Sequence, residues 1–434
     1  MRVTYWILVG LISSVLFIGC SSDAGPGDSG IGDGEDAGDV DPCQAAVPQW
    51  LQTWQITIDE SGLEGLTPDI NVMDVWGTAP DDIYAVGFKG NILHYDGNSW
   101  TKMESGTEAN LEGIWGYVLK DDAGLVTRTD IFAVGSQGTI LRYDGVSWQP
   151  QRVINDPDPA NPDPQIVTGN FHDIWGTEAP GPNPDQHPTV IAVGYGGSAG
   201  LIVRWESLEL EFREMRQRVD FDYPCDAGTC TRISYQAWTP EKLGGVFGTA
   251  ADFFIAVGNN GTILEYDGTA WARTVIAGFT THLKGVWGRG AWEIFGVGLD
   301  GTILRRNNAG VWEDLKQLAQ DQGGFISVTP IFLRSNWGFY QAKCGPTPDG
   351  GTEPEDTSWA FFIGWDNKLF VFHDMLICPM GELDVSRFEG IWDSHPRDET
   401  ERTLEDGGIV CDPVEIIISG VNGSILRLIN EEGQ

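Results

Sequence analysis

Residues 83–100 read IYAVGFKGNILHYDGNSW, and this stretch decides the fold because the chain repeats it. The pattern returns at 131–148 as IFAVGSQGTILRYDGVSW, at 254–271 as FIAVGNNGTILEYDGTAW and, more loosely, at 294–312. In each copy two apolar runs are joined by a glycine turn, and a tryptophan follows the second run. Short runs rich in β-branched and aromatic residues between glycine turns predict β-hairpins.

A further strand is predicted ahead of each copy, where a branched apolar residue precedes an aromatic residue and glycine. These pairs are Trp76-Gly77, Trp115-Gly116, Phe247-Gly248 and Trp287-Gly288. Three weaker copies begin at Trp175-Gly176, Trp337-Gly338 and Trp392. Each complete copy then has four short strands without a long amphipathic helix between them, which predicts one four-stranded antiparallel sheet per copy.

The spacing of the copies predicts the architecture. The glycine that ends the second strand recurs at steps of 40 to 66 residues, at Gly87, Gly135, Gly194, Gly258, Gly298, Gly364 and Gly420. A period near 40 residues with inserted loops is typical of β-propellers. We therefore predict an all-β fold over residues 43–434: a single seven-bladed β-propeller of four-stranded antiparallel blades. Small side chains two positions before the aromatic residue, such as Gly113 and Gly245, are expected where strands crowd around an axis.

The seventh copy has three strands, and the missing strand is predicted to come from the other end of the chain. Residues 50–58, WLQTWQITI, stand before the first copy with strand-like composition. Pairing of this N-terminal strand with the last copy would close the ring and remove its open edges. Since Cys43 precedes this strand and Cys411 lies in the last copy, we predict a disulfide between them.

The first residues have the composition of an export signal, with Arg2, an apolar run at 5–18, and then Gly19-Cys20. This end resembles a bacterial lipobox, with Phe17 at the usual aliphatic position. The resemblance implies a signal peptide at 1–19, lipidation of Cys20 and, because Ser21 follows, an outer-membrane lipoprotein on the periplasmic or cell-surface side. Residues 20–42 are rich in Gly, Ser and Asp and form the predicted flexible acidic tether.

Charge restricts the partners. The formal net charge is −37, from 63 acidic and 26 basic residues. Such a field repels nucleic acid and anionic lipid headgroups, so we expect no nucleic-acid partner and membrane contact through the lipid anchor only. We expect a monomer that binds a protein or glycan of the cell envelope.

The cysteine count suits an oxidising compartment. Seven cysteines less the lipidated Cys20 leave six, which permits three disulfides whose pairing the sequence alone leaves open. Cys225 and Cys230 are close enough to close a small loop, and a disulfide there is favoured over zinc because no second metal-ligand pair is near. With Cys43 paired to Cys411, Cys344 would pair with Cys378.

The Trp-Gly, Ala-Val-Gly and Gly-Thr-Ile-Leu-x-Tyr-Asp-Gly units over residues 45–434 resemble the repeats of β-propeller lipoproteins from myxobacteria. They are more distantly similar to the photosystem II assembly factor family and to the BNR repeat of sialidases. The resemblance implies the propeller fold and says little about function, since propellers host many functions.

Catalytic patterns are weak. Arg142, Arg305 and Arg427 occupy strand positions and do not suggest the arginine cluster of a sialidase. Ser198 lies in a Gly-x-Ser-x-Gly match, but this joins two predicted strands, whereas a nucleophile elbow needs a strand-to-helix turn. His94 is expected to pack within a strand.

No catalytic, cofactor or metal residues are therefore assigned. The acidic loops at 156–159 and 353–356 could supply carboxylates to calcium, but we expect solvated loops. We favour a non-catalytic, lipid-anchored scaffold. The alternative is a carbohydrate-active propeller enzyme, a glycosidase or lyase, which would need carboxylates converging at the central channel.

Overall fold

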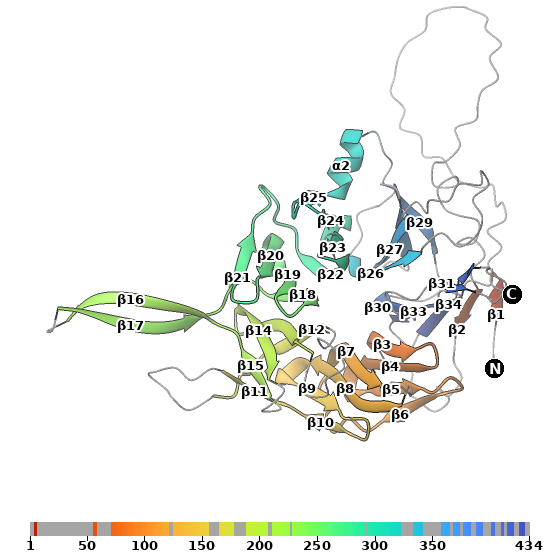
Figure 1. Cartoon of the computed structure of the whole chain (residues 1–434), viewed down its shortest axis with the longest axis horizontal. Helices are drawn as coiled ribbons and strands as arrows, with labels where there is room; N and C mark the ends of the chain where they lie inside the picture. The colour runs from red at the N-terminus through yellow and green to blue at the C-terminus, as the bar shows by residue number, and fades with distance from the viewer. Residues whose placement is uncertain are drawn as a thin grey trace, which may run out of the picture.

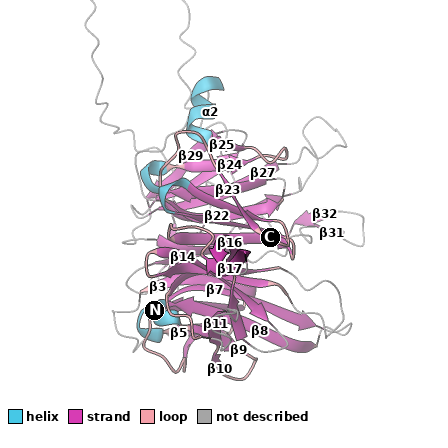
Figure 2. Ribbon diagram, turned by 90° about the vertical axis from the view of Figure 1, so that its left-hand side faces the viewer, coloured by secondary structure: helices cyan, strands magenta, loops and turns pink. Residues whose placement is uncertain are grey.

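The computed structural model describes residues 4–6, 55–58, 71–120, 125–155, 165–177, 188–206, 211–225, 228–291, 293–322, 333–341, 357–364, 368–373, 376–382, 388–393, 401–403, 409–411, 415–420 and 425–429. Strands make up most of this part of the chain, as the magenta ribbons of Figure 2 show. A short helix, α2 (Leu315–Gln322), lies at one end. Within these ranges, none of the helices combines the length and apolar character that crossing a membrane requires.

The strands form antiparallel sheets in chain order. The first sheet contains β3 (Val72–Ala79), β4 (Asp82–Gly87), β5 (Ile92–Tyr95) and β6 (Trp100–Met103). The second contains β7 (Leu111–Lys120), β8 (Val126–Gly135), β9 (Ile140–Tyr143) and β10 (Trp148–Pro150). The third contains β12 (Asn170–Gly176), β13 (Val190–Gly196), β14 (Ala199–Glu206) and β15 (Glu211–Glu214).

The next three sheets repeat this order. The fourth contains β18 (Leu243–Ala250), β19 (Phe253–Gly258), β20 (Thr262–Tyr266) and β21 (Trp271–Thr274). The fifth contains β22 (Leu283–Gly290), β23 (Glu293–Gly298), β24 (Ile303–Arg306) and β25 (Trp312–Asp314). The sixth contains β26 (Leu333–Gln341), β27 (Thr357–Gly364), β28 (Lys368–His373) and β29 (Leu376–Glu382). The prediction of an all-β chain built from repeated four-stranded antiparallel sheets, as in a β-propeller, is confirmed.

The seventh sheet combines both ends of the chain. It contains β30 (Phe388–Asp393), β33 (Glu415–Gly420), β34 (Ile425–Ile429), β2 (Gln55–Ile58) and β1 (Thr4–Trp6). Strand β2 pairs antiparallel with β34, with Ile56 opposite Leu428. Strand β1 pairs with the other edge of β2 and belongs to the predicted signal peptide, so processing would leave four strands in this sheet.

The first strands of neighbouring sheets lie side by side. Strand β3 is next to β7, and the series continues through β12, β18, β22, β26 and β30. Strand β30 is also next to β3. Figure 1 shows these first strands toward the middle of the molecule and the last strands toward the outside.

The apolar core is divided among the spaces between sheets. One cluster joins the first and second sheets, and the next joins the second and third around Phe132 and Phe171. Further clusters lie between the third and fourth and between the fourth and fifth sheets. Another places Trp392 and Ile417 of the seventh sheet against Val75 of the first. Both faces of a strand such as Ile131–Val134 are therefore buried, which explains its continuous apolar run.

The turn between the second and third strands has the same form in four sheets. Its last two residues have left-handed backbone angles: Lys89 and Gly90 have φ of 57° and 67°, and Asn260 and Gly261 have φ of 51° and 64°. Glycine adopts such angles without the clash that a Cβ brings. This explains the second glycine that these four Gly-x-x-Gly turns share.

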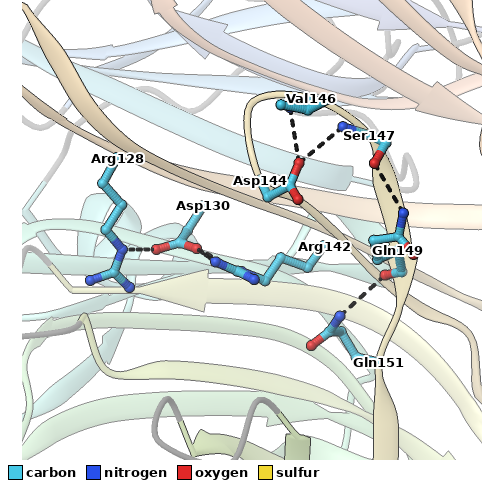
Figure 3. A network of polar contacts seen from close by, with 8 residues as sticks. All are labelled: Arg128, Asp130, Arg142, Asp144, Val146, Ser147, Gln149 and Gln151. Carbon is cyan, nitrogen blue, oxygen red and sulfur yellow. Dashed lines mark hydrogen bonds and ion pairs between the residues drawn. The ribbon is translucent and has the colours of Figure 1, made fainter.

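At the end of the sheets that lies opposite to the Gly-x-x-Gly turns, ion pairs connect the second and third strands. Figure 3 shows Asp130 between Arg128 and Arg142, and the Asp130 side chain is fully buried. The Nε–H of Arg142 donates to Asp130 at 2.6 Å. Glu293 and Arg305 form the equivalent pair in the fifth sheet at 2.7 Å. A buried carboxylate requires such a partner because desolvation is costly.

In the first sheet, His94 stands at the position that Arg142 and Arg305 have in the second and fifth sheets. His94, expected to pack within its strand, stacks on Tyr84 with ring centroids 4.4 Å apart, and its Nε2–H also donates to Asp82 at 2.7 Å. Burial acts to raise the pKa of Asp82, but hydrogen bonds from His94 and Thr78 outweigh this effect and leave the pKa below its ordinary value. The pairing adds an electrostatic contact that the apolar pattern of the strand did not predict.

Two features depart from the predicted four-stranded units. Strand β11 (Arg152–Asn155) joins the third sheet as a fifth strand, parallel to β15, because its Val153 and Ile154 bury their side chains there. The long connection after β15 contains a two-stranded ribbon, β16 (Gln217–Cys225) and β17 (Gly228–Gln236). Figure 1 shows this ribbon projecting well away from the sheets. The two acidic loops considered for calcium, 156–159 and 353–356, lie outside the described residues.

Candidate functional site

A pocket of about 370 Å³ lies where the first strands come together. Most of its wall consists of first-strand residues and of the residues just before these strands, including Lys242 and His282. The pocket is on the face that carries the Gly-x-x-Gly turns, because Asn259 of one such turn also lines it. The rigid sheets thus surround a polar depression of the size used by small-molecule sites.

Each of these first strands has a β-bulge near its start, and six of the bulged residues line this pocket. The register with the second strand shifts after the first residue of each first strand, and after the second residue in β12. The bulged residues that line the pocket are Met73, Glu112, His172, Gly244, Lys284 and Glu389. Arg334 has the same place in the register of β26. Bulges commonly redirect a side chain next to a functional site.

Asp74 and Asp173, one residue after the bulge, join neighbouring sheets. Asp74 accepts hydrogen bonds from the N–H groups of Val75 (3.0 Å) and of Ile114 in the next sheet (2.9 Å). Asp173 accepts in the same way from Ile174 and from Val246, both at 2.8 Å. These two carboxylates are held by main-chain amides and are suited to a structural role.

In most of the other first strands the residue directly after the bulge is glycine, because the neighbouring strands lie too close to leave room for a side chain. A Cβ on Gly245 would lie 3.0 Å from the Cα of Gly285 in the next sheet. A Cβ on Gly390 would lie 2.8 Å from the Cα of Asp74. The expectation of small residues two positions before the aromatic residue therefore has a direct steric reason.

Four side chains form a connected array along the wall. The Nδ1–H of His172 donates to Oε2 of Glu112 at 2.6 Å. The imidazole ring stacks on Tyr195 with centroids 5.4 Å apart, and the Nζ of Lys242 lies 3.9 Å from the centre of the Tyr195 ring. Tyr195 is the only phenyl or indole ring among the described residues lining the pocket. Since His172 and Lys242 already contact this ring, it is a poor platform for a sugar.

His282 is fixed by the turn beside it. Its Nδ1 accepts a hydrogen bond from the N–H of Asn260 at 3.1 Å. In the neutral ring the proton is therefore on Nε2, which makes that nitrogen a hydrogen-bond donor.

The sequence singled out the position two residues before the aromatic residue, and Asp74, Asp173 and Gly285 at that position line the pocket. It did not predict the bulge one residue earlier, which supplies more of the wall. One sequence feature could have revealed the bulged residues. Their position varies between the copies and is mostly charged, whereas the rest of each first strand is mostly apolar. In the described part of the chain, no group of three or more His, Cys, Asp or Glu side chains is arranged to hold a metal ion.

The predicted cysteine sites are distributed as follows. Cys20, Cys43 and Cys344 lie outside the described residues. Cys378 is in β29 opposite Val371, and Cys411 is in β32 (Ile409–Cys411) opposite Glu401 of β31 (Glu401–Thr403). Lipidation and the disulfides between these sites stay predictions.

Cys225 and Cys230 lie near the tip of the ribbon, opposite Gly228 and Tyr223 respectively. A disulfide between them stays a prediction.

The arginine and serine patterns have structural explanations. Arg142 and Arg305 pair with carboxylates of their own sheets. Ser198 is exposed in the turn between β13 and β14, next to Gly197 with φ of 61°. This turn joins two strands, so it lacks the strand-to-helix geometry of a nucleophile elbow.

No family model matches the chain, and no curated protein matches it. Several solved structures are similar in fold. The WD40 β-propeller domain of Doa1 has 10% identity, with 84% of this chain and 93% of that chain covered, and a TM-score of 0.46. YCF48 bound to a D1 peptide has 13% identity, coverage of 87% and 95%, and a TM-score of 0.47. YCF48 from Cyanidioschyzon merolae has 12% identity, coverage of 85% and 98%, and a TM-score of 0.48.

Proposed function

We propose that this chain is a lipid-anchored, non-catalytic scaffold of the outer membrane or cell surface that binds a protein partner. The anchor rests on the lipobox-like end at Cys20 and on the acidic tether at 20–42. The body would be a monomeric, closed ring of seven blades. The myxobacterial type of lipoprotein, named on its repeats, is part of this proposal.

The closed ring is supported by contacts between the first and last sheets. Strand β30 lies beside β3, and a Cβ on Gly77 would be 2.9 Å from the Trp392 ring. Strand β2 adds to β34 in the place where the other sheets have their fourth strand. A closed ring would give the pocket a complete wall.

The assignment of a protein partner rests on the projecting ribbon formed by β16 and β17. Its two nine-residue strands span roughly 30 Å at about 3.3 Å per residue. Among the described strands, β16 and β17 form a sheet only with each other, so both outer edges are available for pairing. Exposed strand edges bind polypeptide through main-chain hydrogen bonds. The net charge of −37 favours a partner with a basic surface and makes association sensitive to salt.

Crosslinking in the native envelope tests this proposal. A variant with 217–236 replaced by a short Gly-Ser turn should lose the protein crosslinked to the full-length chain, while keeping its melting temperature. The control is a double variant, Val146→Ser and Val275→Ser, which alters exposed side chains on other sheets. Unchanged crosslinking by the ribbon variant would show that the partner does not bind there.

The anchor is tested separately. Labelling cells with a clickable fatty acid should mark the full-length protein, and Cys20→Ala should abolish the label and release the chain from the membrane fraction. Retention of both label and membrane association by Cys20→Ala would exclude lipidation at this residue.

A further inference from the structure

The charges of the central pocket are separated by sign. The basic residues come from the fourth and fifth sheets: Lys242 and His282 directly precede β18 and β22, and Lys284 lies in β22. Four carboxylates, Asp74, Glu112, Asp173 and Glu389, come from β3, β7, β12 and β30. In the order of neighbouring first strands, the acidic group runs from β30 through β3 and β7 to β12, and the basic group follows at β18 and β22. The pocket therefore has an acidic side and a basic side.

Several of these side chains are held in place by contacts within the wall. Glu112 is held by His172, and Asp74 by two main-chain amides. On the basic side, Lys242 lies over Tyr195, and His282 is oriented by the N–H of Asn260. Groups oriented before binding lose little entropy when a ligand arrives. The charge separation is thus built into the fold.

Two of the residues that line the pocket leave little surface for a broad protein partner to contact. Met73 and Glu389 line it and are only 6% and 3% exposed. Its volume of about 370 Å³ is near the lower end of small-molecule sites. A ligand that matches it must be small and must carry opposite charges at its two ends.

We infer that the pocket binds a zwitterionic ligand, an amino acid or short peptide with a free amine and a free carboxylate. The carboxylate would face Lys242, Lys284 and the Nε2–H of His282. The ammonium group would face Glu112 and Glu389. This site is separate from the ribbon, so the inference does not depend on the proposed protein partner.

Calorimetry with three forms of one dipeptide tests the inference on the full-length protein in detergent. The probes are alanyl-alanine with both ends free, its N-acetyl form and its C-terminal amide. Only the free dipeptide presents both charges, so each capped form should bind at least about tenfold more weakly. Equal binding of a capped form, or no binding of any form, would overturn the inference.

Substitutions test which side of the pocket binds the carboxylate of the dipeptide and which side binds its ammonium group. Lys284→Met should weaken binding of the free dipeptide at least about tenfold, and Lys284→Arg should retain most of it, because the positive charge is kept. Glu112→Gln should weaken the free dipeptide and leave the weak binding of the N-acetyl form unchanged. Equal effects of Lys284→Met and Lys284→Arg, at unchanged melting temperature, would count against a charge-recognising pocket. Crosslinking through the ribbon should be unaffected by all three substitutions.

Discussion

The contact of an indole ring with a glycine is the residue-scale unit that joins one sheet to the next. A Cβ on Gly116 would lie 2.6 Å from the Trp76 ring, and a Cβ on Gly176 would lie 2.3 Å from the Trp115 ring. The aromatic residue of one sheet thus fills the space left by the glycine of the next. This is why the aromatic residue and glycine recur as a pair in the sequence.

Gly116→Ala should therefore destabilise the protein by about 1–3 kcal/mol, the usual cost of overpacking a core. The matched control is Gly296→Ala, where the added Cβ meets side chains only at 3.7–4.0 Å. Other copies of the repeat already have alanine there, as at Ala133, so this change should be neutral or stabilising by up to about 1 kcal/mol. Urea unfolding measures both. Equal losses would mean that the ring-to-glycine contact is not the cause.

Hairpin turns are the elements that the sequence predicted best. In the turn between the third and fourth strands, Asp267 accepts hydrogen bonds from the N–H groups of Ala270 and Thr269, both at 2.9 Å, and from the Thr269 hydroxyl at 2.7 Å. The Ala270 amide, the Thr269 hydroxyl and the Thr269 amide together lower the pKa of Asp267 to about 2. Asp144 makes the equivalent bonds to Val146 and Ser147, seen in Figure 3, and its pKa is also lowered.

These turns predict an acid-sensitive contribution to stability. The pKa of Asp267 is about 2 in the folded chain and about 3.9 when unfolded, so the unfolded state binds more protons between these values. The contribution is complete above about pH 4 and is lost as the pH falls toward 2. Asp267→Asn should lower the unfolding free energy at pH 6 and flatten its fall between pH 4 and 3. Asp300→Asn, which removes another exposed carboxylate, is the control, and equal slopes for both variants would contradict the assignment.

Other elements were beyond the reach of the sequence pattern for physical reasons. Gly-x-x-Gly and Tyr-Asp-Gly turns are recognisable because the required backbone angles are local properties. The pocket is not local, since it exists only where bulges from several distant strands meet. Strand β11 was missed because its pairing with β15 depends on tertiary contact. The ribbon did carry a signal, the alternation of Val219, Phe221 and Tyr223 with charged residues, which is typical of a strand.

At the scale of the whole molecule, the proposed ring depends on how its first and last sheets meet. The seventh sheet buries Trp392 and Ile417 in the same apolar cluster as Val75 of the first sheet. Its β34 edge is covered by β2, with Ile56 and Ile58 opposite Leu428 and Leu426. An uncovered β34 would present unpaired main-chain groups, which invite association with other chains.

Removal of β2 should therefore open the ring, and two truncations separate this effect from loss of the tether. A chain beginning at residue 43 keeps β2 and should match the full-length protein in melting temperature and remain monomeric. A chain beginning at residue 59 loses four cross-strand pairs, at about 0.2–1 kcal/mol each, and should melt at a lower temperature and associate at higher concentration. A synthetic peptide of residues 50–58 should restore the melting temperature of this shorter chain by pairing with β34. Equal melting temperatures and monomeric behaviour of both truncations would contradict closure by β2.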